Sequence, residues 1–418
     1  MDKWYIQMIN EVQLLLVTSL YDGFSKCIIA LSVARWLYAI TKSICPIESH
    51  APTRASIVPE PGVRHTKPGI NNAKATHSTP ASSPSKKSRL TSGIILRVSF
   101  RKQRLEKAGH HFLALWGFFV LCAHLHAASH PLYPQCRLRT RPWFTSKPGC
   151  SLLEINCREE QFNGAAADIK RIVSKVEADH IEHLVIRHCP ALEVPPHVSQ
   201  LNHLLGLKVY NSIIAEWSES AAITSTSHPM LRFIFLIDMN ATTFPVGLLS
   251  PEFPQRLAQV VISKSNVTEI PDHLDTIWPK GLVLILEEMQ LQAFPDTVSR
   301  MLPIYLSLAL NNLTTVPAAL FMTSFIPLMV LNGNPIKALP PNVAPFPHVG
   351  WLSLFSTNIE VLPDWILYKA PPMAFITAAN TPMCARLIAN GEATAEIKDG
   401  SMAGIDCSIK LIGSGPVN

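Results

Sequence analysis

Cysteine is the residue type whose number and placement in this chain point most directly to chemistry. The nine cysteines fall beside the N-terminal apolar segments, before a repeated region, inside it and after it: Cys27, Cys45 and Cys122; Cys136, Cys150 and Cys157; Cys189; and Cys384 and Cys407. No C-x-x-C occurs, and no set of Cys and His has zinc-finger spacing. The pattern therefore indicates disulfide formation in an oxidising compartment.

The pairing of the first group is only partly determined by the sequence. If residues 151–157 are extended, Cys150 and Cys157 lie about 23 Å apart at about 3.3 Å per residue, which is beyond disulfide reach. Cys136 is therefore expected to pair with one of these two, and which one stays open. Cys189 is predicted to be a buried free thiol, with a bridge to Cys157 as the alternative.

Catalytic motifs of the common enzyme classes do not occur in the chain. There is no G-x-S-x-G, no Walker loop, no G-x-G-x-x-G and no protein-kinase motif set. The nearest metal-like cluster is Glu177, His180, Glu182 and His183, but it leads into a predicted strand, where alternate side chains point to opposite faces. We expect no enzyme activity, no catalytic residue, no metal site and no cofactor.

One sequence pattern recurs eight or nine times between about residues 181 and 384 and predicts the structural elements that position the cysteines. Its clearest copy is Leu306, Leu308, Asn311, Leu313, Val316 and Pro317. The position of Asn311, here called the ladder position, recurs at 189, 212, 239, 265, 289, 311, 334, 357 and 380. This spacing predicts stacked rungs with one short strand each, in which Leu308 lies in the core and its neighbour Ser307 is exposed.

The pattern matches the rule L-x-x-L-x-L-x-x-N-x-L, and over about residues 150–407 the chain resembles the leucine-rich repeat family. The similarity is to its typical class with repeats of about 23 to 24 residues, particularly to secreted or receptor-ectodomain members. It implies an α/β fold, a leucine-rich repeat solenoid that forms a curved right-handed horseshoe with a parallel β-sheet on the concave face. It also implies recognition of a protein or peptide ligand, without catalysis.

In that family the residues between and after the strand leucines point into the concave face. The corresponding candidates for ligand contact are Arg187, Tyr210, Phe235, Ile237, Val261, Ile285, Glu287 and Phe355. The apolar column around Phe235 and Ile237, which continues through Val261 and Ile285, is expected to need a cover, because contiguous apolar surface on a soluble protein usually marks a binding site. A partner protein or a second copy of the chain would supply it.

Three N-x-[ST] sequons begin one residue after a ladder position, at Asn240, Asn266 and Asn312. This site faces solvent on the turn of a repeat, where a glycan could be tolerated. We predict N-glycosylation at all three.

Residues 1–110 are predicted to form a largely disordered, basic N-terminal region. Residues 46–110 hold twelve Lys and Arg against three acidic residues, whereas the whole chain has a formal charge of +6. Residues 46–92 are rich in Pro, Ser and Thr and lack helical or strand periodicity, so they bury too little surface to fold. Because the positive charge is local to this region, the repeats are not expected to bind nucleic acid.

Residues 111–129 have the order of a secretory signal or a signal anchor. A basic cluster ending at Lys107 precedes the apolar run 112–123, which small residues follow at 127–129. The run is shorter than the ~20 residues of a membrane span, yet an uncleaved anchor through residues 112–128 would place the basic flank in the cytosol and the repeats outside. A buried helix packed on the first repeat and an over-extended gene model are the alternatives.

The remaining boundaries are an N-terminal cap at residues 130–180, repeats at 181–383 and a C-terminal cysteine cap and tail at 384–418. In the first cap, a helix is expected to bury one face, formed by Ile169, Ile172, Val173 and Val176. Cys384 and Cys407 are predicted to pair and close the end of the stack. The chain is expected outside the cell, secreted or anchored, and the alternatives are an intracellular signalling scaffold and a truncated relative of a receptor kinase.

Overall fold

The computed structural model of the protein describes Arg35 and residues 86–322, 326–343, 349–367, 375–390 and 405–408. The chain divides into two compact units, with the boundary after Ala123. Predictions for residues 1–85 lie outside the described residues, apart from Arg35.

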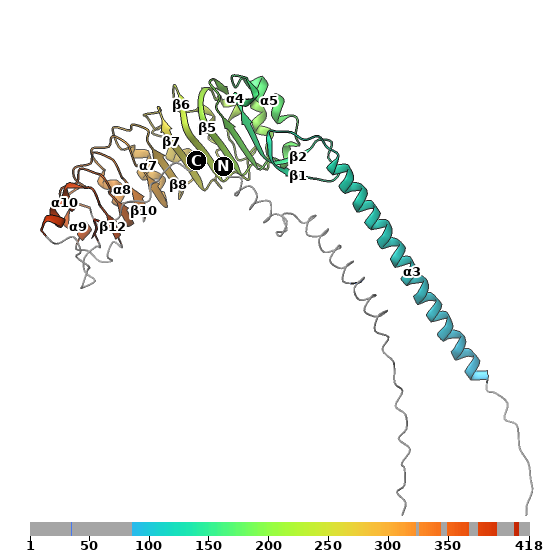
Figure 1. Ribbon diagram of the computed structural model, residues 1–418. Coiled ribbons are helices and arrows are strands. Elements are labelled where there is room, and N and C mark those ends of the chain that lie inside the picture. The colour runs from blue at the N-terminus through green and yellow to red at the C-terminus, as the bar shows by residue number, and fades with distance from the viewer. Residues whose placement is uncertain are drawn as a thin grey trace, which may run out of the picture. The chain divides into compact units, whose positions relative to one another are not determined.

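The larger unit is a mixed α/β structure built on one open sheet of thirteen strands (Figure 1). Its strands are β1 (Cys136–Thr140), β2 (Gly149–Asn156), β3 (His183–Arg187), β4 (Leu192–Glu193), β5 (Gly206–Glu216), β6 (Phe233–Ala241), β7 (Gln259–Ser265), β8 (Val283–Glu287), β9 (Tyr305–Ser307), β10 (Ile326–Val330), β11 (Val349–Ser353), β12 (Phe375–Thr377) and β13 (Ile405–Asp406). Among the described strands, only β1 and β2 pair antiparallel; the other pairs are parallel, and β4 joins the sheet beside β5.

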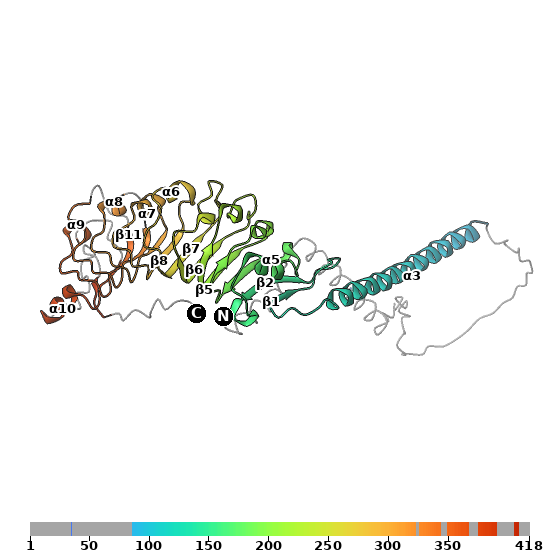
Figure 2. The same ribbon diagram turned by 90° about the horizontal axis from the view of Figure 1, so that it is seen from above.

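Short helices connect successive strands, and α6 to α9 lie along one side of the strand stack (Figure 2). The helices of this unit are α4 (Cys157–Glu160), α5 (Ala166–Val173), α6 (Leu274–Ile277), α7 (Asp296–Met301), α8 (Ala318–Met322), α9 (Asp364–Leu367) and α10 (Pro382–Ala389), with 3-10 turns η1 (Ala178–His180), η2 (Pro196–Gln200), η3 (Glu219–Ala221) and η4 (Val246–Leu248). Each strand and its return segment form one rung.

The core runs between the strands and the return segments of all rungs. Leu306 and Leu308 are both 0% exposed, and the strands pair in register from rung to rung, so that Leu284, Leu306 and Met329 lie in one row. Because strand side chains alternate, one face of every strand enters this core and the other faces away. The predicted strand phase is confirmed along the stack.

A residue with left-handed backbone conformation immediately precedes the ladder position in every described rung. The series is His188, Asn211, Asp238, Lys264, Glu288, Leu310, Gly333, Ser356 and Asn380, with φ between 44° and 67°. The last member corrects one prediction, since Asn380 is exposed and Thr381, at 3% exposure, holds the ladder position. Asparagine tolerates this backbone region better than most residues, so Asn380 fits the bend rather than the core.

Asparagine at the ladder position satisfies buried backbone groups of two rungs. The Asn311 side chain accepts hydrogen bonds from the amides of Met289 and Leu291, at 2.9 and 3.2 Å, and donates to the carbonyls of Leu286 and Leu308, at 2.8 and 2.9 Å. In β5 and β6, which carry Ser212 and Met239 there, the strands instead continue past the ladder position and pair with each other. The longer parallel pairing takes over the backbone hydrogen bonds where asparagine is missing.

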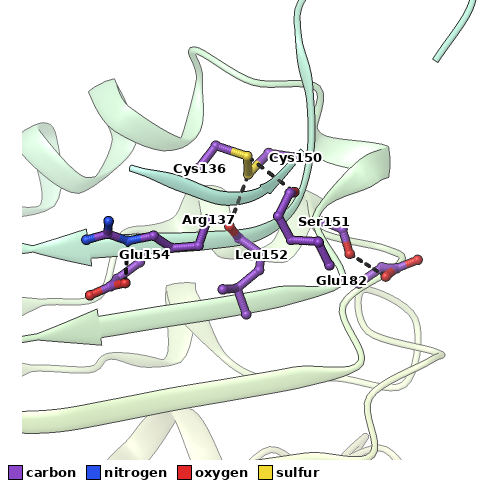
Figure 3. The surroundings of a disulfide bond; sticks show 8 residues. Cys136, Arg137, Cys150, Ser151, Leu152, Glu154 and Glu182 are labelled. Atoms are coloured by element: carbon purple, nitrogen blue, oxygen red, sulfur yellow. Dashed lines mark hydrogen bonds and ion pairs between the residues drawn. A yellow bond between two sulfur atoms is a disulfide. The ribbon is translucent and has the colours of Figure 1, made fainter. Parts of the chain in front are cut away.

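The predicted N-terminal cap covers the first rung. The side chains of Ile169, Ile172, Val173 and Val176 are at most 4% exposed, as predicted, but helix α5 ends at Val173 and Val176 lies beyond it. Cys136 of β1 pairs with Cys150 of β2, which resolves the open choice between Cys150 and Cys157 (Figure 3).

The prediction of a free thiol at Cys189 is wrong, because the structure pairs it with Cys157. Strands β2 and β3 are parallel neighbours that place Asn156 opposite Arg187. Cys157 directly follows this pair and Cys189 lies one residue beyond the left-handed bend at His188. The two Cα atoms therefore lie 4.9 Å apart, within the usual disulfide range.

At the other end, Cys384 of α10 is bonded to Cys407, with 1.99 Å between the sulfur atoms. The segment that precedes Cys407 also forms β13, which pairs parallel with β12. The parallel stack therefore extends into the predicted C-terminal cap.

The smaller unit contains most of helix α3 (Lys86–Ala128). Because this helix begins at Lys86, the prediction of disorder for residues 86–110 is wrong. Once the apolar segment has formed a helix, extending the helix by one more residue costs little free energy. The stretch Lys107–Ala128, 22 residues, is long and apolar enough to cross a membrane, at about 33 Å for a rise of ~1.5 Å per residue. The helical stretch therefore extends beyond the apolar run at residues 112–123 on both sides. Large apolar side chains are exposed on it, including Phe112, Leu115 and Phe118 at 65 to 69%.

Candidate functional site

The outward side chains of β3 and β5 to β12 form one continuous surface, here called the open face. Parallel pairing places them in three rows. The first row is His183, Gly206, Phe233, Gln259, Val283, Tyr305, Leu328, Trp351 and Phe375, and the second is Val185, Lys208, Phe235, Val261, Ile285, Ser307, Val330, Ser353 and Thr377. The third row begins with Arg187, Tyr210, Ile237, Ser263 and Glu287.

Three of the predicted contact residues lie side by side in the second row. Phe235 pairs with Val261, and Val261 with Ile285; all three are partly exposed. These three residues are called the apolar row below. Their register confirms that they form one strip across three rungs.

The other predicted contacts separate into exposed and covered residues. Arg187 and Tyr210 are neighbours in the third row and partly exposed, and Phe355 is partly exposed farther along the stack. Ile237 and Glu287, in contrast, are only 5% and 8% exposed. The prediction that these two face solvent is wrong.

Close strand spacing makes this burial depend on the neighbouring side chains. Parallel strands lie about 4.8 Å apart, so each outward side chain is flanked by its two neighbours in the row, and its exposure depends on how far they extend over it. Ile237 lies between Tyr210 and Ser263 in this way.

Glu287 accepts a hydrogen bond from Ser307, which is 0% exposed rather than exposed as predicted. Burial raises the pKa of Glu287, the bond from Ser307 opposes this in part, and Glu288 adds a smaller upward effect.

The first row carries large aromatic residues that the sequence reasoning missed. Phe233 and Trp351 are 37% and 39% exposed. The ring of Phe233 lies 6.2 Å from that of Phe235, and the ring of Trp351 lies 5.5 Å from that of Phe375, edge to face. The sequence could have indicated them, because the residue immediately before the first core position of a strand also points outward.

The polar residues in the later rungs of the open face satisfy one another. Ser353 donates to the side-chain oxygen of Asn332 at 2.7 Å, and Thr377 donates to Ser353 at 2.8 Å. All three are less than 10% exposed. These hydrogen bonds join the three side chains into one polar network beneath Trp351, whose indole nitrogen donates to Thr377 at 3.5 Å.

A charge cluster of β1, β2, β3 and α4 lies at the end of the open face that begins with β3. Arg137 and Arg187 each lie 2.7 Å from a different oxygen of Glu154 (Figure 3 shows the first pair). Glu159 lies 3.7 and 3.8 Å from the same two guanidinium groups. Lys208 is next to this cluster, 5.7 Å above the ring of Tyr210.

In the structure, Glu182 and His183 of the metal-like cluster make separate contacts. Glu182 accepts a hydrogen bond from Ser151 (Figure 3), and the ring of His183 lies so close to Gly206 that a Cβ there would be 2.7 Å from its Nδ1. Burial lowers the pKa of His183, against an upward effect of Glu182. Among the described residues, no group of three or more His, Cys, Asp or Glu side chains is placed to hold a metal.

The three sequon asparagines Asn240, Asn266 and Asn312 are exposed. Asn266 accepts a hydrogen bond from the amide of Ala241 through its side-chain oxygen, at 2.8 Å. The side-chain nitrogen, to which a glycan attaches, is not used in that bond. Glycosylation stays a prediction.

No family model matches this chain, and no curated protein matches it. Among solved structures, it is similar to a leucine-rich repeat protein of Leptospira interrogans, with 14% sequence identity and a TM-score of 0.30. The match covers 55% of this chain and 72% of the other.

Proposed function

We propose that the chain is a leucine-rich repeat recognition protein, without enzyme activity, whose open face binds a protein or peptide ligand. The apolar row with Phe233 beside it is the observation that carries this proposal. These residues project away from a core that other side chains already fill, so folding does not require them to be apolar. Exposed apolar and aromatic surface with Arg and Tyr nearby is typical of protein interfaces.

The repeat class is supported by the ladder. Asn311 and Asn334 bond backbone groups of two rungs in the same way, since Asn334 also joins Leu313, Leu308 and Leu331. These bonds recur at the interval that the sequence pattern predicted, which is the behaviour of a repeat that stacks on its neighbours.

An extracellular setting is supported by three cysteine pairs at bonding distance, Cys136–Cys150, Cys157–Cys189 and Cys384–Cys407. Structural disulfides persist in oxidising compartments and are rare in the cytosol, which disfavours the intracellular scaffold. Helix α3 would act as a signal or a membrane anchor, with the basic residues before Lys107 on the cytosolic side.

The proposal is tested by capture on the full-length chain, displayed on cells, with surface and secreted proteins as the prey. The variant Phe235→Glu with Ile285→Lys should lose specific partners, because it places two charges in the apolar row. Met230→Glu with Val361→Lys is the matched control, since these residues are 42% and 59% exposed and lie outside the strands. Partners are identified by quantitative mass spectrometry.

The proposal fails if the apolar-row variant reaches the cell surface and captures the same proteins as the unaltered chain. If that variant alone does not reach the surface, the apolar row is part of the core and the open face is withdrawn. Equal surface levels of both double variants, with partner loss in the first only, support recognition through the open face.

A further inference from the structure

Lys208 is a half-buried cation on the open face whose charge is not matched locally. It lies in the second row between Val185 and Phe235. Among the residues that the structure describes, no carboxylate is within ion-pair distance of its ammonium group. Its contact is with the ring of Tyr210 at 5.7 Å.

The acidic groups of the neighbouring charge cluster are already paired with arginine. Glu154 lies between Arg137 and Arg187, and Glu159 faces the same two guanidinium groups at 3.7 and 3.8 Å. With Lys208, three cations share two carboxylates. Burial, followed by repulsion from Arg187, lowers the pKa of Lys208 below its usual value. A partly desolvated ammonium in this position favours an additional anion.

The apolar row begins on the rung directly after Lys208. From Lys208 to Ile285 the second row crosses three strand spacings, or about 14 Å at ~4.8 Å each. An extended peptide advances about 3.3 Å per residue, so about four residues span this distance. A carboxylate at one end and apolar side chains along the rest match the row.

This inference rests on the proposed function and specifies its ligand. We infer that the open face binds an extended segment of a partner protein that places a carboxylate on Lys208 and apolar side chains on the apolar row. The carboxylate completes the charge cluster, and the apolar side chains cover the three partly exposed residues of the apolar row. A neutral or basic segment would leave the Lys208 charge unpaired.

A phage-displayed library of random dodecapeptides, selected on the full-length chain, tests this inference. Selected peptides should carry Asp or Glu within about four residues of apolar side chains. Lys208→Gln should weaken their binding by about ten- to a hundredfold, the range for a charge-assisted hydrogen bond. Lys208→Arg should retain most of it, and high salt should weaken it.

Lys175→Gln is the matched control, because this lysine also lies 5.7 Å above an aromatic ring, that of Tyr133, but away from the open face. The inference is overturned if selected peptides bind through the apolar row yet lack an acidic residue. It is also overturned if Lys208→Gln weakens binding no more than Lys175→Gln does.

Two other results separate this inference from the function on which it rests. Peptides whose binding survives Phe235→Glu with Ile285→Lys would remove the open face as the binding site, and both ideas would fall. If the purified chain self-associates and the same double variant abolishes this self-association, a second copy of the chain occupies the open face. That result would overturn only the inference that the occupant is a segment of a partner protein.

Discussion

Replacing Asn311 by alanine should destabilise the repeat stack far more than replacing Thr357, the polar residue at another ladder position. The substitution leaves the amides of Met289 and Leu291 and the carbonyl of Leu286 without the side-chain hydrogen bonds that Asn311 supplies. The Leu308 carbonyl keeps its bond from Asn334. At about 1 to 3 kcal/mol for each unsatisfied buried group, and with water entering part of the space, we expect a loss of about 3 to 5 kcal/mol.

Thr357→Ala is the matched control for this substitution. Thr357 is also buried at a ladder position, at 1% exposure, but its hydroxyl makes a single hydrogen bond, to the carbonyl of Leu354 at 2.8 Å. Its replacement should cost about 1 kcal/mol. The expected difference between the variants is therefore about 2 to 4 kcal/mol.

Urea denaturation of both variants, followed by far-ultraviolet circular dichroism under oxidising conditions, measures this difference in the free energy of unfolding. The comparison requires that the free energy of unfolding falls with urea concentration at a similar slope in both variants. Equal losses for Asn311→Ala and Thr357→Ala would refute the account in which asparagine joins two rungs through several buried bonds. The strand pairing alone would then carry the stack.

Three further outcomes are expected. Leu308→Ala should lower the free energy of unfolding by about 2 to 5 kcal/mol, because Leu308 is fully buried. Val361 is 59% exposed, so Val361→Ala should lower it by about 0.5 kcal/mol or less. Thermal or urea denaturation measures both. His228 is 0% exposed and lies 2.9 Å from the carbonyl of Val198, and burial lowers its pKa below 6.5. The unfolded chain therefore binds more protons, so stability should fall as pH drops below about 6.5, and melting curves of His228→Gln should show a smaller loss. Non-reducing peptide mapping should recover Cys157 linked to Cys189; both thiols open to alkylation would contradict that pair.

Local regularities explain why much of the architecture could be predicted from the sequence. Alternation along a strand depends only on backbone geometry, so the buried state of Leu306 and Leu308 followed from their spacing. The interval between rungs repeats along the chain, and it therefore located the strands. The helix that buries Ile169 and Ile172 was indicated by the same kind of local spacing.

The open face was predicted less completely, because exposure depends on neighbouring rungs. Phe235, Val261 and Ile285 were placed in one row correctly, but Ile237 and Glu287 are covered by side chains of adjacent strands. Those neighbours are twenty or more residues away in the sequence, and no local pattern records how far their side chains extend.

Two features were decided only by the tertiary structure. The bond between Cys157 and Cys189 depends on the parallel register of β2 and β3, which brings together residues 32 positions apart. The unmatched charge of Lys208 depends on Glu154 being held by two arginines from other strands. Sequence spacing sets which side of a strand each residue faces, whereas register between strands sets which residues meet, and only the folded sheet fixes that register.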